Sequence, residues 1–166
     1  KKTHRGKRKR VDYLLSYKQD FPIALIEVKE NNHNLGDGMQ QALDYAQSLD
    51  IPFVFSTNGD AYLFHDKTVK DNPEKEIKLD NFPSPEFLYN KFLIWKNLKL
   101  NDDKIFLNDL YLDQESKEPR YYQRIAINKT VEAIEKNRKK ILLVLATGTG
   151  KTFVAFQIIW KLWKAK

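Results

Sequence analysis

Three charged residues near the N-terminal end have the types and spacing of a phosphodiesterase centre. Asp12 lies at the start of one apolar run, and Glu27 and Lys29 close the next one, two positions apart. Alternate residues of a strand share a face, so Glu27 and Lys29 should point the same way. Two neighbouring carboxylates form the oxygen-rich site that Mg²⁺ prefers, and a metal-bound water loses its proton far more readily than bulk water. We expect Asp12 and Glu27 to be metal ligands, and Lys29 to orient or deprotonate the attacking water and to offset charge on phosphorus.

A carboxylate followed at a distance by ExK is a common string, and strand-end charges often form a solvated face or an ion pair instead. Two further features favour catalysis. Glu27 and Lys29 end an otherwise apolar run, and Gln41 and Tyr45 lie four residues apart on the flank of the next apolar stripe, so one helix would carry both on one side. We therefore predict that Gln41 and Tyr45 belong to the same centre; the alternative is a surface amide and a half-buried phenol.

A glycine-rich segment near the C-terminal end predicts a phosphate-binding loop. An apolar run precedes it and an amphipathic run follows it. Glycines allow the backbone N–H groups and the following helix N-terminus to surround a triphosphate, the lysine reaches the outer phosphates, and the last hydroxyl can bind the Mg²⁺ of the nucleotide. The predicted nucleotide-binding residues of the loop are Thr147, Gly148, Thr149, Gly150, Lys151 and Thr152.

The loop lacks the first glycine of the GxxxxGK[ST] pattern, because Leu145 stands there. In this form it resembles motif I of superfamily 2 helicases and DNA translocases. Upstream, Arg120, Tyr122 and Gln123 resemble the adenine-reading segment of the same motors, in which a glutamine recognises the adenine edge and an aromatic residue stacks on it. The alternative for this cluster is ordinary packing at the start of a helix.

The elements that must position these residues form an α/β pattern. Period-2 and continuous apolar runs predict strands at 11–17 and 22–29, joined by a short loop, then at 51–56, 61–65 and 141–145. Helical spacing predicts a three-turn helix after an N-cap at Asp37, a short helix capped by Ser84 and running toward Leu98, one over 122–135 and one from the glycine loop to Trp163. Residues 66–80 and 101–118 are expected to be turn-like or connecting. The fold class is therefore α/β with a mixed sheet.

Charge and composition narrow the possible classes. The net charge of +7 lies at one end, because seven of the 29 lysines and arginines fall in the first ten residues, leaving 22 basic against 22 acidic residues. A uniformly basic nucleic-acid-coating protein is excluded. We expect Lys7, Arg8, Lys9 and Arg10 to contact DNA phosphates; a solvated tail is the equal alternative. With no cysteine, no signal peptide and no apolar run near the roughly 20 residues needed to span a bilayer, we expect a cytoplasmic protein without a membrane partner.

The combination of signals resembles a known family. Asp12, Glu27 and Lys29 resemble the signature of the PD-(D/E)XK nucleases, and Gln41 with Tyr45 resembles the QxxxY extension of their RecB-like members. Followed by a superfamily 2 phosphate loop, they resemble the restriction (motor) subunit of type I restriction-modification enzymes, from about Lys9 to Trp163. The resemblance implies an endonuclease domain at 1–100, a connecting segment at 101–118 and the start of a RecA-like ATPase lobe at 119–166.

The same resemblance implies cleavage of double-stranded DNA after ATP-driven translocation, with Mg²⁺ and ATP as cofactors. It also implies modification and specificity subunits as partners, which bring S-adenosylmethionine. Only 14 residues follow Thr152, so most ATPase motifs are missing, and we expect the chain to be a piece of a longer protein. The competing interpretation is an ATP-gated DNA-binding scaffold whose nuclease fold is catalytically silent and whose acids form ion pairs.

Overall fold

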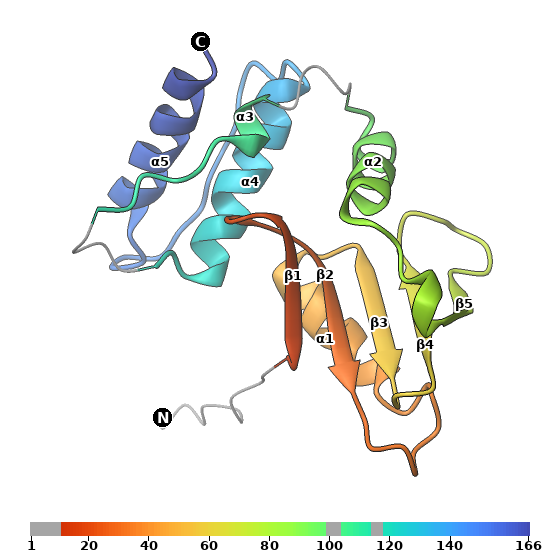
Figure 1. Ribbon diagram of the computed structural model, residues 1–166. Helices are drawn as coiled ribbons and strands as arrows, with labels where there is room; N and C mark the ends of the chain where they lie inside the picture. The colour runs from red at the N-terminus through yellow and green to blue at the C-terminus, as the bar shows by residue number, and fades with distance from the viewer. Residues whose placement is uncertain (1–10, 99–103, 114–117) are drawn as a thin grey trace. The chain divides into compact units, whose positions relative to one another are not determined.

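The computed structural model describes residues 11–98, 104–113 and 118–166 (Figure 1). They form two compact units. Unit 1 contains the chain up to Leu15 and Ala24–Phe82, and unit 2 contains Ser16–Ile23 and Pro83–Lys166. In the described parts of the chain, no helix is both long enough and apolar enough to cross a membrane.

A five-stranded mixed sheet carries the first predicted site. Its strands are β1 (Tyr13–Lys18), β2 (Phe21–Val28), β3 (Phe53–Thr57), β4 (Ala61–Asp66) and β5 (Glu74–Lys78), in the order β1-β2-β3-β4-β5. β2 and β3 are parallel, whereas the β3–β4 and β4–β5 pairs are antiparallel. The prediction of an α/β fold with a mixed sheet is confirmed, and so are the first four strands to within a few residues.

Helix α1 (Met39–Leu49) covers the central strands of unit 1. Its buried face consists of Met39, Ala42 and Ala46, which pack in one cluster with Leu25 and Val54. The alanines have no side chain beyond Cβ, so the helix backbone can approach the sheet closely. β3 is buried along its whole length, as expected for a strand that is covered and has neighbours on both sides.

The N-terminus of α1 differs from the prediction. Gly38 rather than Asp37 is the N-cap, and it makes no side-chain hydrogen bond. The Asp37 carboxylate instead accepts a hydrogen bond from the backbone N–H of Asn34, at 3.1 Å, within the preceding turn. A short acidic side chain competes equally well for turn and cap positions, which is why the sequence pattern misplaced the cap by one residue.

A fifth strand replaces part of the segment expected to be turn-like. β5 lies at the edge of the sheet, and Ile77 is its only apolar residue. Charged side chains are usual on an edge strand, because they discourage pairing with a further strand. With a single apolar residue, β5 shows no alternation of apolar and polar positions, so the sequence pattern does not predict it.

Among the residues that the structure describes, unit 2 contains the α-helices α2 (Pro85–Lys96), α3 (Lys104–Leu107), α4 (Tyr121–Glu135) and α5 (Lys151–Lys164). Ser84 caps α2 by accepting the backbone N–H of Phe87 at 3.2 Å, as predicted. The helices expected around α4 and α5 are also confirmed. α3 was not expected, because it lies within the stretch predicted to be a connection, and its four residues are too few to show helical periodicity.

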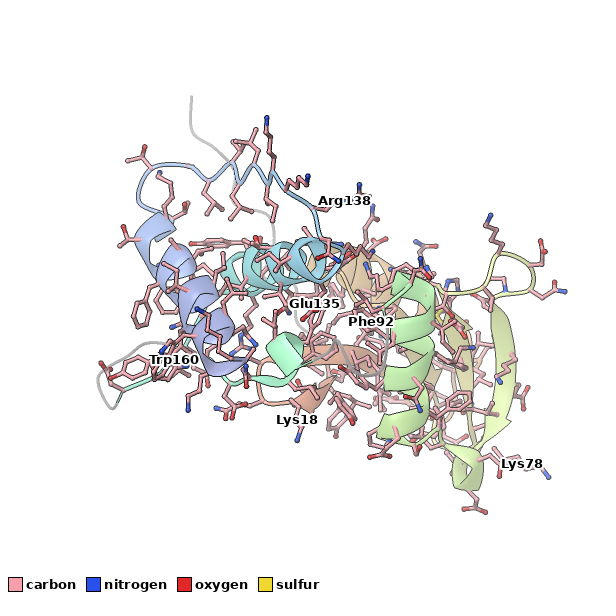
Figure 2. The ribbon with its side chains drawn as sticks, turned by 90° about the horizontal axis from the view of Figure 1, so that it is seen from above. Lys18, Lys78, Phe92, Glu135, Arg138 and Trp160 are labelled. Atoms are coloured by element: carbon pink, nitrogen blue, oxygen red, sulfur yellow. The ribbon has the colours of Figure 1, made fainter. Side chains whose placement is uncertain are left out.

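Within unit 2, the end of β1 and the start of β2 pack through aromatic rings. Phe21 makes edge-on contacts with Tyr89, Phe92 and Phe106, with ring centroids 5.1 to 5.8 Å apart. Tyr17 stacks on Tyr89 at 4.1 Å. Figure 2 labels two aromatic residues of this unit, Phe92 on α2 and Trp160 on α5.

The predicted strand at 141–145 is wrong. The chain past α4, from about Arg138 in Figure 2 to the glycine loop, has no regular structure, and no described strand pairs with it. Leu142 and Val144 are 86% and 85% exposed. A strand forms only where another strand accepts and donates its backbone hydrogen bonds, and the sheet of β1 to β5 does not include this segment.

Candidate functional site

The acidic pair predicted from the sequence lies at one end of the β1–β2 hairpin, in unit 1. Asp12, just before β1, accepts the backbone N–H of Val28 at 2.8 Å. Val28 directly follows Glu27 and precedes Lys29. This hydrogen bond therefore places the Asp12 carboxylate beside the ExK triplet, although the two are separated by the whole hairpin.

Glu27 is the buried centre of this group. Its side chain is 3% exposed, and its Oε1 accepts hydrogen bonds from Lys29 Nζ at 2.9 Å and Gln41 Nε2 at 2.7 Å. Gln41 Nε2 also donates to the Tyr45 hydroxyl at 3.1 Å. The structure thus brings all five residues of the predicted nuclease centre into one neighbourhood, with Gln41 and Tyr45 supplied by α1.

The Lys29 side chain is held in its charged form. The hydrogen bond to Glu27 raises the pKa of Lys29 above its ordinary value, although partial burial acts in the opposite direction. A protonated amine cannot accept a proton. Of the two roles expected for Lys29, the geometry therefore favours charge neutralisation over general-base catalysis.

The donor set of this centre fits a hard divalent cation. Glu27 Oε2 is buried and has no hydrogen-bond partner among the described residues, while Oε1 is already engaged. Asp12 adds a second, exposed carboxylate. The described residues contain no group of three or more acidic, histidine or cysteine side chains at metal-binding distance. The unpartnered Glu27 oxygen is nevertheless a hard ligand of the kind that Mg²⁺ prefers.

The second predicted site forms a cavity of about 320 Å³ in unit 2. Six of the predicted nucleotide-binding residues line it, together with two that the sequence analysis did not identify. The lining consists of Glu118, Arg120, Tyr122, Gln123, Gly148, Thr149, Gly150 and Phe153. The predicted Thr147, Lys151 and Thr152 lie outside this lining and are exposed.

Gln123 ties the start of α4 to the glycine loop. Its Oε1 accepts the backbone N–H of Arg120 at 2.9 Å, and its Nε2 donates to the carbonyl of Thr149, also at 2.9 Å. A side chain at Gly150 would place its Cβ 2.5 Å from Gln123 Nε2, and the positive φ of +83° there also favours glycine. The positive φ is therefore the main reason for glycine at this position, and a side chain there would also displace the Gln123 amide.

The Lys151 side chain is hydrogen-bonded to the backbone just before the glycines of the loop. Its Nζ donates to the carbonyls of Leu145 and Ala146, at 3.3 and 3.1 Å. To reach phosphate oxygens, the ammonium group must leave these carbonyls, which a charge-assisted bond to an anion would favour.

The remaining predicted contacts, Lys7, Arg8, Lys9 and Arg10, lie outside the described residues. The sequence analysis missed Ser56 and Gly38, which approach Glu27 in unit 1, and Lys161, which is buried in unit 2. Of these, only Ser56 could have been found from the sequence. It ends the apolar run predicted as a strand at 51–56, which a parallel sheet would place beside the strand of Glu27.

Comparison with known protein families gives two matches along the chain. The family described as type I restriction enzyme R protein N terminus matches residues 2–83. The family described as type III restriction enzyme, res subunit, matches residues 116–166. The two matches separate the candidate nuclease centre from the candidate nucleotide cavity.

Individual relatives are similar over most of the chain. It is 51% identical over 160 residues to the type I restriction enzyme EcoAI endonuclease subunit of Escherichia coli, covering 95% of this chain and 20% of that protein. It is 34% identical over 127 residues to the EcoKI endonuclease subunit of Escherichia coli strain K12, covering 70% of this chain and 10% of the relative. The chain thus spans about a fifth of the length of the EcoAI subunit, and its match covers a tenth of the EcoKI subunit.

A solved structure shows the same similarity in three dimensions. The fragment structure of an HsdR subunit of a type I restriction enzyme from Vibrio vulnificus superposes with a TM-score of 0.84 at 45% identity. The match covers 97% of this chain and 30% of that chain.

Proposed function

Because the chain belongs to the family of type I restriction enzyme R subunits, we propose that it carries the Mg²⁺-dependent endonuclease centre of such an enzyme and the first elements of its ATP-driven DNA motor. The endonuclease domain is assigned to 1–100, the connection to 101–118 and the start of the motor lobe to 119–166. The chain covers a small part of its relatives, so the activity belongs to the whole subunit.

One observation carries the proposal. Lys29 and Gln41 both hold the same oxygen of the buried Glu27 carboxylate, so its other oxygen is left for a cation. Asp12, whose carboxylate accepts the Val28 N–H at the start of the hairpin, supplies a second carboxylate next to the triplet. A buried carboxylate oxygen is costly to leave without a partner, which is expected where a ligand supplies the missing interaction.

Each residue has a distinct part in phosphodiester hydrolysis. Asp12 and Glu27 would hold Mg²⁺, which when bound makes a water molecule more acidic and offsets charge on the phosphate. Lys29, kept protonated by Glu27, places a positive charge where negative charge develops on the non-bridging oxygens. Gln41 fixes the orientation of the Glu27 carboxylate, and Tyr45 fixes Gln41.

The nucleotide cavity supports the motor part of the proposal. Gly148, Thr149 and Gly150, which would receive the phosphates, line this cavity together with Tyr122 and Gln123. We assign ATP to this cavity, with Thr152 as the hydroxyl ligand of its Mg²⁺. Double-stranded DNA is the substrate, and modification and specificity subunits are the partners, through which S-adenosylmethionine acts.

A silent nuclease fold is the second candidate, and one observation favours it. Glu27 and Lys29 form an ion pair at 2.9 Å, which a fold without activity would also use to neutralise a buried carboxylate. The two candidates differ in what the loss of either partner does to DNA cleavage.

The test replaces Glu27 and Lys29 separately in the complete restriction complex. We expect Glu27→Gln and Lys29→Ala each to reduce DNA cleavage by about 100-fold or more, because each removes a group that binds or stabilises developing charge. ATP hydrolysis should stay at the parental rate. Glu30→Gln is the matched control, since Glu30 is exposed and adjacent to the triplet. Parental cleavage by both variants would establish the silent scaffold instead.

A further inference from the structure

Ser56 is a buried hydroxyl that the proposed nuclease centre does not yet use. It lies near the end of β3, is 0% exposed, and its Oγ has no hydrogen-bond partner among the described residues. Most buried polar groups are paired, because an unpaired one loses its hydrogen bonds to water without compensation. An unpaired hydroxyl retained in a core is therefore expected to serve a ligand or a neighbouring site.

The sheet places Ser56 directly beside Glu27. The two residues are partners in the parallel β2–β3 register, so their side chains lie on the same face of adjacent strands, about 4.8 Å apart along the hydrogen-bonding direction. Glu27 Oε2 is the other buried oxygen without a partner in this part of unit 1. Two buried oxygens at neighbouring register positions thus both lack a hydrogen-bond partner.

Gly38 makes room for this arrangement. A Cβ on Gly38 would lie 2.9 Å from Ser56 Oγ, 3.0 Å from Glu27 Cγ and 3.2 Å from Lys29 Cε. The backbone of Gly38 has a φ of −88°, which any residue can adopt. Glycine is therefore required there by the space around Glu27 and not by the conformation of the chain.

We propose that Ser56 is a positioning residue of the nuclease centre, whose hydroxyl donates directly to the Glu27 carboxylate and so holds it in the orientation that binds the cation. Gly38, which has no side chain, keeps open the space that this interaction needs. The inference rests on the proposed nuclease function. Lys29 and Gln41 hold one oxygen of Glu27. Ser56 would donate to one lone pair of the other oxygen, whose second lone pair stays available to the cation, so the carboxylate cannot rotate away from it.

The strength of this effect can be anticipated from other metal centres. Replacing a residue that holds a metal ligand, without touching the metal, typically weakens metal binding or activity by about 10- to 100-fold. Loss of the Ser56 hydroxyl should therefore fall within this range.

The first test is Ser56→Ala in the full-length subunit, with Ser48→Ala as the matched control. Ser48 lies exposed on α1, where its hydroxyl donates to the carbonyl of Asp44 at 3.0 Å. We expect Ser56→Ala to weaken direct Mn²⁺ binding, followed calorimetrically or by electron paramagnetic resonance, by about 10-fold. The Mg²⁺ concentration for half-maximal cleavage in the complex should rise by a similar factor, while the urea midpoint of the metal-free protein stays equal or higher.

The second test compares Gly38→Ala with Gly36→Ala. A Cβ on Gly36 would make only an ordinary contact, at 3.4 Å from Leu63 Cδ2. Gly38→Ala should weaken Mn²⁺ binding at least as much as Ser56→Ala does, whereas Gly36→Ala should bind Mn²⁺ like the parent.

The outcomes separate this inference from the proposed function. If Ser56→Ala binds Mn²⁺ as tightly as Ser48→Ala while Glu27→Gln abolishes cleavage, the nuclease function stands and the role of Ser56 is overturned. If Gly38→Ala binds like Gly36→Ala, the role of Gly38 is overturned, and the Ser56 comparison remains decisive even if Gly38→Ala does not fold. If Glu27→Gln itself cleaves like the parent, the proposed function fails.

Discussion

Lys161 shows how far a single residue can depart from its usual environment. It lies on α5 in unit 2, is 2% exposed, and donates to the carbonyls of Phe106 and Asn108. One turn earlier, Gln157 pairs with both the N–H and the carbonyl of Tyr111. These two side chains attach α3 and the residues that follow it to α5, and the attachment buries a cation. Burial lowers the pKa of Lys161 to about 8, although Asp20 and Asp109 act in the opposite direction.

This lowered pKa predicts a rise in stability at alkaline pH. Between pH 8 and the ordinary lysine value of 10.5, the unfolded chain retains a proton that the folded protein has released. The free energy of unfolding should therefore increase with pH in this window, by at most about 3 kcal/mol, and should not depend on Lys161 below it.

Urea unfolding at pH 8 and pH 10 would measure the effect. Lys161→Met should lose this increase, whereas Lys164→Met, which replaces an exposed lysine on the same helix, should keep it. The same pH dependence in Lys161→Met and the parent would contradict the prediction.

At the scale of elements, α2 shows how local signals define a helix. Ser84 caps its first turn, Pro85 occupies the first helical position, and Asn97 ends it in the left-handed conformation with a φ of 55°. Its last turn is tied to α4 by an ion pair of 3.1 Å between Lys96 and Glu132. The boundaries of α2 therefore follow from residues within or next to it, which is why the sequence predicts them.

Removal of the cap should destabilise the protein by a measurable amount. Ser84→Ala leaves the N–H of Phe87 without its acceptor, and we expect a loss of about 1 kcal/mol in the free energy of unfolding. Ser84→Asp, which retains an acceptor, should restore most of it. Chemical denaturation of the three proteins would decide the matter, and equal midpoints would show that the cap contributes nothing.

At the scale of the whole molecule, the chain contains two candidate centres of different chemistry. The carboxylate centre belongs to unit 1 and the nucleotide cavity to unit 2. No described residue takes part in both. A substitution in one centre should therefore leave ligand binding at the other unchanged in the isolated subunit.

Lys151→Ala tests this separation. We expect it to abolish ATP hydrolysis by the complete enzyme, because it removes the cation expected to bind the outer phosphates, while Mn²⁺ binding by the subunit remains parental. Lys139→Ala, at an exposed position before the loop, is the control. ATP hydrolysis that survives Lys151→Ala would refute the assignment of the motor.

The sequence by itself determined those features whose causes lie close together along the chain. The hairpin, α1, α2, α4 and the glycine loop follow from apolar periodicity, caps and turn residues, and the common face of Glu27 and Lys29 follows from the two-residue period of a strand. The residue types of the two candidate centres could also be recognised in the sequence, because only a few kinds of side chain can bind a cation or a phosphate.

Only the tertiary structure decided which distant residues meet. It placed Ser56 beside Glu27 through the parallel register, left 141–145 without a strand partner, and made β5 an edge strand despite its charged composition. It also buried Lys161 against backbone carbonyls. In each case the deciding interaction is a hydrogen bond or a packing contact between segments far apart in the chain, and local periodicity contains no information about which segments will become neighbours.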